Sequence, residues 1–213
     1  MNNEILQITV IIILLSFNSY SQTQELDEVY INCVEKDIID SIHHILGNDD
    51  VAISFFDSIA KFESFLIEKR LLLSRRKNDY KDLILKLRDN KNDSVFEKIY
   101  KEVKNRNVFL DVYALSAGTN GRLYDHCLDK LISFAKEKRR LIRMKITCEK
   151  IYSKGYVDIH ILKELNKKIN FKSRAFRLSF CNLIYRHLYA KYDENAIKRR
   201  NIPKPKLLEI HKN

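Results

Sequence analysis

Residues that break helices are scarce in this chain, and this scarcity restricts the fold more than any other feature. The 213 residues include only four glycines and two prolines, and both prolines, Pro203 and Pro205, lie near the C-terminus. A sheet-rich fold needs many tight turns, which glycine, proline and asparagine favour. Leu, Ile, Lys and Glu are abundant instead, at helical spacing. The sequence therefore predicts an all-α fold.

The spacing of apolar residues predicts one domain over residues 22–193, a bundle of about six or seven helices. The segment 108–115 is compatible with a helix or a strand. The tail, 194–213, is basic, and we expect it to be mobile. We expect the core to come mainly from the second, fifth and last of the predicted helices, which span 24–46, 50–72, 79–88, 94–105, 122–153, 158–169 and 173–192.

Residues at the predicted helix ends support these boundaries. Asp50 and Asp158 are suited to cap helix N-termini, because a short carboxylate can accept from the free N–H groups of the first turn. Ser94 and Glu97 have the spacing of a capping box. Gly155 can end the helix 122–153, because glycine adopts the left-handed conformation that terminates many helices.

The N-terminus carries an uncharged apolar run, residues 5–17. A spanning helix needs roughly 20 apolar residues, so the run is closer to the core of a signal peptide. Ser19 and Ser21 match the small residues before a cleavage site, which predicts a signal peptide 1–21 and cleavage before Gln22. Glu4 and the lack of Lys or Arg before the run argue against this prediction. The alternatives are an uncleaved membrane anchor and a buried first helix. Export would place the protein in a bacterial periplasm or outside the cell.

The four cysteines, Cys33, Cys127, Cys148 and Cys181, would meet an oxidising compartment after export. If the helix 122–153 is continuous, Cys127 and Cys148 lie about 31 Å apart along its axis, whereas a disulfide needs Cα atoms within about 7 Å. We therefore prefer the pairs Cys148–Cys181 and Cys33–Cys127. The alternative is four buried thiols that act as small apolar side chains. The sequence contains no CxxC motif, so it indicates neither a zinc ribbon nor a thioredoxin-type centre.

The charge balance is basic, with 39 Lys and Arg against 28 Asp and Glu and a net charge of +11. The densest basic segment runs from Lys136 to Arg143, and a glycine-containing loop precedes the predicted helix at Arg122. Backbone N–H groups in such a loop can bind an anion, although the spacing matches no known phosphate motif. The alternatives are a solvated helix face and a simple connection. The candidate anion-binding residues are Gly118, Asn120, Gly121, Arg122, Lys136, Lys138, Arg139, Arg140 and Arg143.

The residues 124–127, Tyr-Asp-His-Cys, place four reactive side chains in a row. Neighbours on a helix point in different directions, however, and a Cys–His pair depends on proximity in space. His43 and His44 are better explained by the negative end of a helix dipole than by metal binding. We predict no catalytic, metal or cofactor residues and no cofactor.

Three functions compete. The sequence favours an exported, non-catalytic protein that binds another protein, because export is predicted and catalytic motifs are missing. The alternative is a binder of anionic lipid, lipopolysaccharide or nucleic acid through its basic patches. The third is an enzyme that uses the loop 118–122 and His126. The sequence does not indicate the oligomeric state.

Overall fold

The computed structural model describes residues 25–37, 40, 55–105, 122–134 and 138–200, and every regular element in these ranges is a helix. The prediction of an all-α fold is therefore confirmed for the described residues. Residues 25–37 form the first helical segment. The elements that follow are α2 (Phe55–Glu68), α3 (Lys77–Arg88), the 3₁₀ helix η1 (Asn90–Asn92), α4 (Asp93–Asn105), α6 (Arg122–Phe134), α7 (Lys138–Lys154), α8 (Ile159–Lys168), α9 (Arg174–Tyr192) and α10 (Glu194–Arg200).

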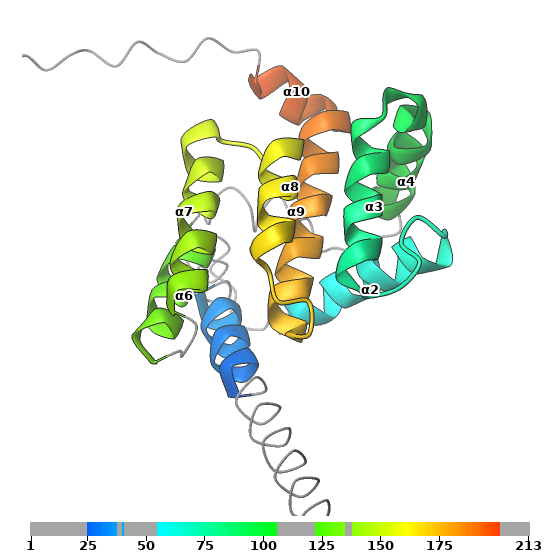
Figure 1. The fold of residues 1–213 in the computed structure, drawn as a ribbon. Coiled ribbons are helices and arrows are strands. Elements are labelled where there is room, and N and C mark those ends of the chain that lie inside the picture. The colour runs from blue at the N-terminus through cyan, green and yellow to red at the C-terminus, as the bar shows by residue number, and fades with distance from the viewer. Residues whose placement is uncertain (1–24, 38–39, 41–54, 106–121, 135–137, 201–213) are drawn as a thin grey trace, which may run out of the picture.

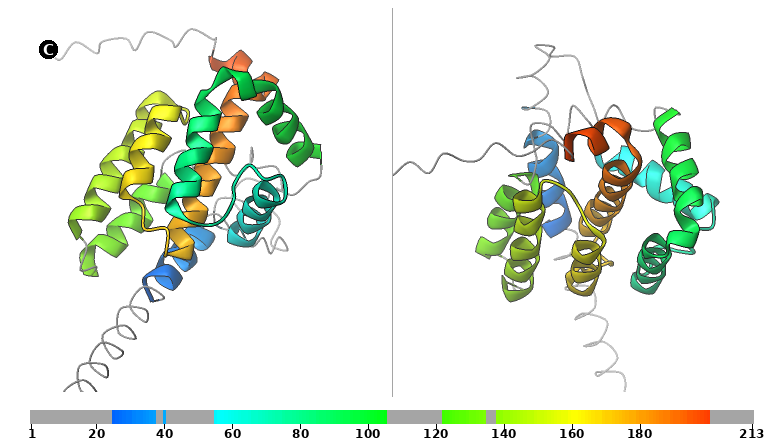
Figure 2. Two further views of the ribbon diagram at one scale, coloured as in Figure 1. Left: turned by 45° about the vertical axis from the view of Figure 1, so that its right-hand side comes forward. Right: turned by 90° about the horizontal axis from the view of Figure 1, so that it is seen from above.

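The helices form two layers. In the view from above, α7, α8 and α3 lie side by side in one row, and α9 lies behind this row (Figure 2). The helix α9 packs against α2, α4, α8 and α10, and α2 crosses its lower end (Figure 1). This arrangement makes α9 the central helix, with one layer of helices, α7, α8 and α3, facing solvent in front of it.

The core is built mainly on α2 and α9. The apolar stripe of α2 is buried from Phe55 to Leu66, as the spacing predicts. Burial extends to most sides of α9, where polar Ser179 and Asn182 are buried beside the apolar residues. The ring of Phe62 on α2 lies 5.5 Å from that of Tyr185 on α9 in an edge-to-face contact, a favourable geometry for aromatic pairs.

The prediction of one continuous helix over 122–153 is wrong. The chain forms two helices, α6 and α7, which pack against each other and are separated only by residues 135–137. Such a short connection makes neighbouring helices antiparallel. The hairpin buries an apolar stripe on each helix, with Leu128 and Leu131 on α6 and Leu141 and Met144 on α7, which a single straight helix could not bring together.

Several predicted helix ends are confirmed. The carboxylate of Asp158 accepts a hydrogen bond from the backbone N–H of Ile161 at 2.8 Å and caps α8. Gly155 has a φ of +75° directly after α7, and its N–H donates to the Ile151 carbonyl oxygen at 2.8 Å. The last predicted helix, 173–192, corresponds to α9, and the Ser173 side chain caps it.

The capping box at Ser94 is wrong. Asp93 already has helical backbone angles, φ −56° and ψ −46°, so Ser94 lies inside α4 rather than before it. Glu97 pairs instead with Lys101 at 2.7 Å, one turn further along the helix. The 3₁₀ helix η1 leads directly into α4, which removes the extended residue that a capping box needs.

The first residues of the predicted tail, 194–200, form the helix α10. Asp193 is the residue before this helix, and its carboxylate accepts hydrogen bonds from the N–H groups of Asn195 and Ala196. Ala196 is buried, so α10 packs on the bundle. No described helix is long and apolar enough to cross a membrane. The predicted signal peptide 1–21, Asp50, the segment 108–115 and residues 201–213 lie outside the described residues.

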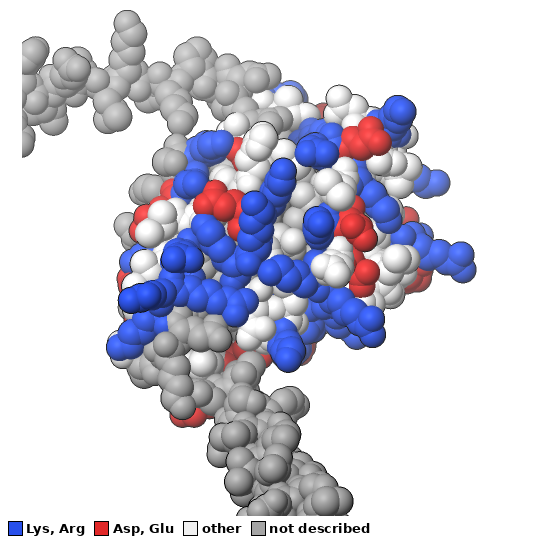
Figure 3. All heavy atoms as spheres, in the orientation of Figure 1, with Lys and Arg blue, Asp and Glu red and all other residues white. Residues whose placement is uncertain are grey.

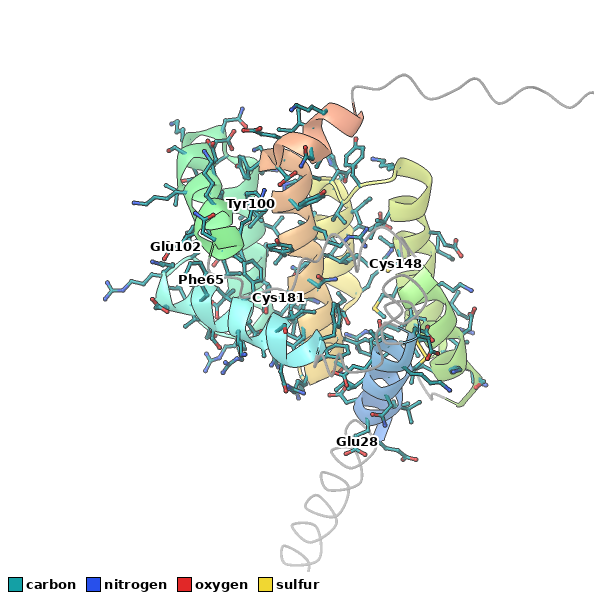
Figure 4. All side chains as sticks on the ribbon, turned by 180° about the vertical axis from the view of Figure 1, so that it is seen from behind. Glu28, Phe65, Tyr100, Glu102, Cys148 and Cys181 are labelled. Atoms are coloured by element: carbon teal, nitrogen blue, oxygen red, sulfur yellow. A yellow bond between two sulfur atoms is a disulfide. The ribbon has the colours of Figure 1, made fainter. Side chains whose placement is uncertain are left out.

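One predicted disulfide is present and the other is not. Cys33 and Cys127 form a disulfide with a Cα–Cα distance of 5.7 Å. Cys148 and Cys181 are buried thiols, so the prediction that they pair is wrong. They lie on α7 and α9, well apart in Figure 4, because α8 packs against both of these helices.

Candidate anion-binding face

The C-terminal end of α8 is the point where cations from three helices meet. Lys77, at the start of α3, donates from Nζ to the carbonyl oxygen of Lys167 at 3.1 Å. Arg140, near the start of α7, donates from Nε to the carbonyl oxygen of Lys168. The last carbonyl groups of a helix lack partners within the helix and carry a partial negative charge. These carbonyls therefore hold one cation on each side of α8.

Further bases surround this point. We call the surface the basic face, and Figure 3 shows it as a band of Lys and Arg across the front layer of helices. The segments that supply it are distant in the sequence and become neighbours because α3 and α7 both pack against α8. Its residues are exposed except for half-buried Arg140 and Lys168, and they comprise Arg76, Lys77, Lys138, Arg139, Arg140, Arg143, Lys163, Lys167, Lys168 and Lys172.

One acid is built into the basic face. Glu164 on α8 accepts from Lys150 at 2.8 Å and from Lys168 at 2.6 Å, and from the Thr147 hydroxyl at 3.0 Å. The hydrogen bonds from Lys150 and Lys168 lower the pKa of Glu164 to about 2. The carboxylate thus stays ionised at neutral pH, joins α7 to α8 and balances part of the positive charge.

The helix α7 adds apolar side chains to this surface. Ile142 is 43% exposed and Ile146 is 52% exposed. They lie on the same side of the helix as Arg139 and Arg143, because residues three or four positions apart are neighbours on a helix surface. The outer side of α7 therefore presents a stripe in which bases and large apolar groups are mixed.

The basic face contains four of the predicted anion-binding residues, namely Lys138, Arg139, Arg140 and Arg143. Gly118, Asn120, Gly121 and Lys136 lie outside the described residues. Arg122 begins α6, and its side chain also lies outside the described part.

The basic face also contains bases of α8 and of the residues after it that were not among the predicted residues, namely Lys163, Lys167, Lys168 and Lys172. The spacing of Lys163 and Lys167 places both on one side of a helix, which was a usable signal. Nothing local, however, indicates that this side lies beside α7.

A second polar cluster lies in the core around Glu63, which is 1% exposed. Its Oε1 accepts from the Arg177 Nε at 2.8 Å and from the Tyr80 hydroxyl. Its Oε2 accepts from the Arg75 Nε at 2.8 Å. Burial, with added repulsion from neighbouring Cys181 and Glu63, raises the pKa of Tyr80. Because fixed donors from the loop after α2, from α3 and from α9 occupy both oxygens, the cluster serves to join these elements.

The described part of the reactive sequence at 124–127 is the side chain of Cys127. Cys127 is bonded to Cys33, so its sulfur is not a nucleophilic thiolate while that bond is intact. The side chain of His126, like residues His43 and His44, lies outside the described part of the structure. The hypothesis of an enzyme that uses His126 therefore stays untested.

Comparison of the chain with protein-family models, with curated proteins and with solved structures finds no match.

Proposed function

We propose that this protein binds anionic lipid surfaces through the basic face. The observation that carries the proposal is the meeting of Lys and Arg residues from α3, α7 and α8 around the C-terminal end of α8. A Lys or Arg near an anionic membrane contributes about 1 kcal/mol to binding. Several bases on one side of the molecule can act together, whereas the same charges spread evenly could not.

The exposed isoleucines favour a lipid surface over a nucleic acid. Proteins that lie on membranes combine basic residues with apolar side chains that enter the headgroup region. Ile142 and Ile146 stand beside Arg139 and Arg143 on α7, which is this combination. Non-specific nucleic-acid binding relies mainly on phosphate contacts, and single strands also stack on aromatic residues. Isoleucine provides neither interaction.

The experiment measures binding to vesicles of phosphatidylcholine with and without phosphatidylglycerol. The test variant carries Arg139→Ser and Arg143→Ser. The control carries Lys98→Ser and Lys101→Ser, which removes the same charge from exposed positions on α4. All proteins share the apolar residues 5–17, so a difference between variants reports on the basic face.

We expect binding to require phosphatidylglycerol and to weaken as salt is added. With about 1 kcal/mol for each base, the test variant should bind roughly 30-fold more weakly, and the control should change several-fold less. Equal losses in the two variants would show that net charge, rather than this face, drives binding. Preference for an oligonucleotide over the vesicles would replace lipid by nucleic acid as the ligand.

A protein partner is the second candidate, because Ile142 and Ile146 could also pack against an apolar surface of another protein. In that case a pull-down recovers a stoichiometric partner, and Ile142→Ser with Ile146→Ser removes it. The lipid proposal predicts that this double substitution weakens vesicle binding and that the pull-down recovers no such partner.

A further inference from the structure

The disulfide lies beside a carboxylate, Asp37, that no sequence motif singles out. Cys33 and Asp37 are one turn apart on the helical segment 25–37, and Cys127 lies on α6. The two sulfurs and a carboxylate oxygen of Asp37 all lie within 4.8 Å of one another. The Oδ2 of Asp37 is 3.6 Å from the Cys127 Sγ.

We propose that the reduced protein binds Zn²⁺ through Cys33, Asp37 and Cys127. Tetrahedral zinc has Zn–S bonds of about 2.3 Å and Zn–O bonds of about 2.0 Å, which place a sulfur and an oxygen ligand about 3.5 Å apart. The observed separation of 3.6 Å between Asp37 and Cys127 already has this value. The two sulfurs must move apart to make room for the metal, and three protein ligands leave the fourth position to water.

The disulfide and the metal site exclude each other. When a phosphine reduces the disulfide, the phosphorus supplies two electrons and takes up the oxygen of one water molecule. The two protons of that water molecule complete the two thiols. Zinc then replaces both protons, because thiolates rather than thiols are its ligands. In an oxidising compartment the sulfurs bond to each other, and in a reducing compartment they bind the metal.

Burial makes the site selective. Cys33 is 7% exposed and Cys127 is 0% exposed, so bulk water does not solvate the two thiolates. Two buried negative charges are costly unless a cation compensates them, and a divalent metal supplies that compensation. Thiolate ligands favour zinc over magnesium or calcium, which prefer oxygen. The proposal concerns a different part of the molecule from the basic face and does not depend on lipid binding.

The test uses the full chain with Cys148→Ser and Cys181→Ser, so that Cys33 and Cys127 are the only thiols left. This protein is reduced with a phosphine under nitrogen and titrated with Co²⁺, which reports on zinc sites by its absorption. We expect a thiolate-to-cobalt charge-transfer band that saturates at one metal per chain and disappears when Zn²⁺ is added. Protein that has not been reduced should show no band.

The role of the carboxylate is tested by Asp37→Asn, with Asp40→Asn as the control at an exposed position. We expect Asp37→Asn to weaken Co²⁺ binding by more than about tenfold and Asp40→Asn to have little effect. Circular dichroism establishes that the variants are folded, and if Asp37→Asn does not fold, the cobalt titration of the parent protein decides. A missing charge-transfer band, or equal affinity in the two folded variants, would overturn the proposal.

Discussion

Replacement of Glu63 by glutamine should cost a large part of the stability of the fold. The carboxylate is buried and receives Tyr80, Arg75 and Arg177. Glutamine keeps the shape and still accepts from Tyr80, but it removes the negative charge. The guanidinium of Arg177 is then left without its counter-charge, and its side chain is only 15% exposed.

The expected loss can be estimated from the burial of each partner. Removing one partner from a buried ion pair costs about 3–5 kcal/mol, because the other charge stays in the interior. Arg75 is 54% exposed and can turn into solvent, so most of the loss comes from Arg177. A domain of this size loses roughly 2–4 °C for each kcal/mol, which corresponds to a fall in Tm of about 6–20 °C.

The assay is urea unfolding followed by circular dichroism. The control is Glu68→Gln, which changes an exposed acid on the same helix and should alter the free energy of unfolding by less than about 0.5 kcal/mol. Glu63→Leu combined with Arg177→Met should be less destabilising than Glu63→Gln, because it removes both charges together. A loss below about 1 kcal/mol for Glu63→Gln would refute the assignment of Glu63 and Arg177 as a structurally required pair.

Two further predictions concern pH and the disulfide. The folded-state pKa of Glu164, about 2, is below its ordinary value of 4.5, so the stability that this carboxylate contributes is present above pH 4.5 and is lost as the pH falls towards 2. The Tm difference between the parent protein and Glu164→Gln should therefore shrink over this pH range. A constant difference would contradict the assignment of Glu164 as an ionised carboxylate that stabilises the fold. The disulfide joins residues 94 positions apart. Its reduction, with a chelator present so that no metal binds the thiols, should lower the free energy of unfolding by about 2–4 kcal/mol. Unchanged urea unfolding would contradict this expectation.

Local spacing was sufficient to predict most of the described helices and the apolar stripe of α2. Asp158 and Gly155 marked the boundary between α7 and α8 correctly, because capping depends only on residues within one turn. The break between α6 and α7 was missed because residues 135–137 are Ala-Lys-Glu, which are good helix formers. The apolar stripes of the two helices pack against each other, and no pattern of residues three or four positions apart indicates that contact.

The cysteine pairing depends on which helices are neighbours, and local spacing does not supply that information. We excluded a contact between Cys127 and Cys148 by assuming one straight helix, and we placed Cys148 beside Cys181. The helix α8 in fact packs against both α7 and α9, and the two thiols lie apart. The pair Cys33–Cys127 was predicted correctly, but Asp37 beside it was not noticed, because its distance from Cys127 depends on the packing of two separate helices.

The sequence by itself determined the helical class, the excess of positive charge and the faces of individual helices, because each depends on composition or on residues three and four positions apart. The tertiary structure decided which faces meet. It placed Lys77 and Arg140 at the two sides of α8 and Asp37 beside the disulfide. Contacts of this kind join residues far apart in the chain, and they exist only after the apolar stripes of several helices have packed into one core.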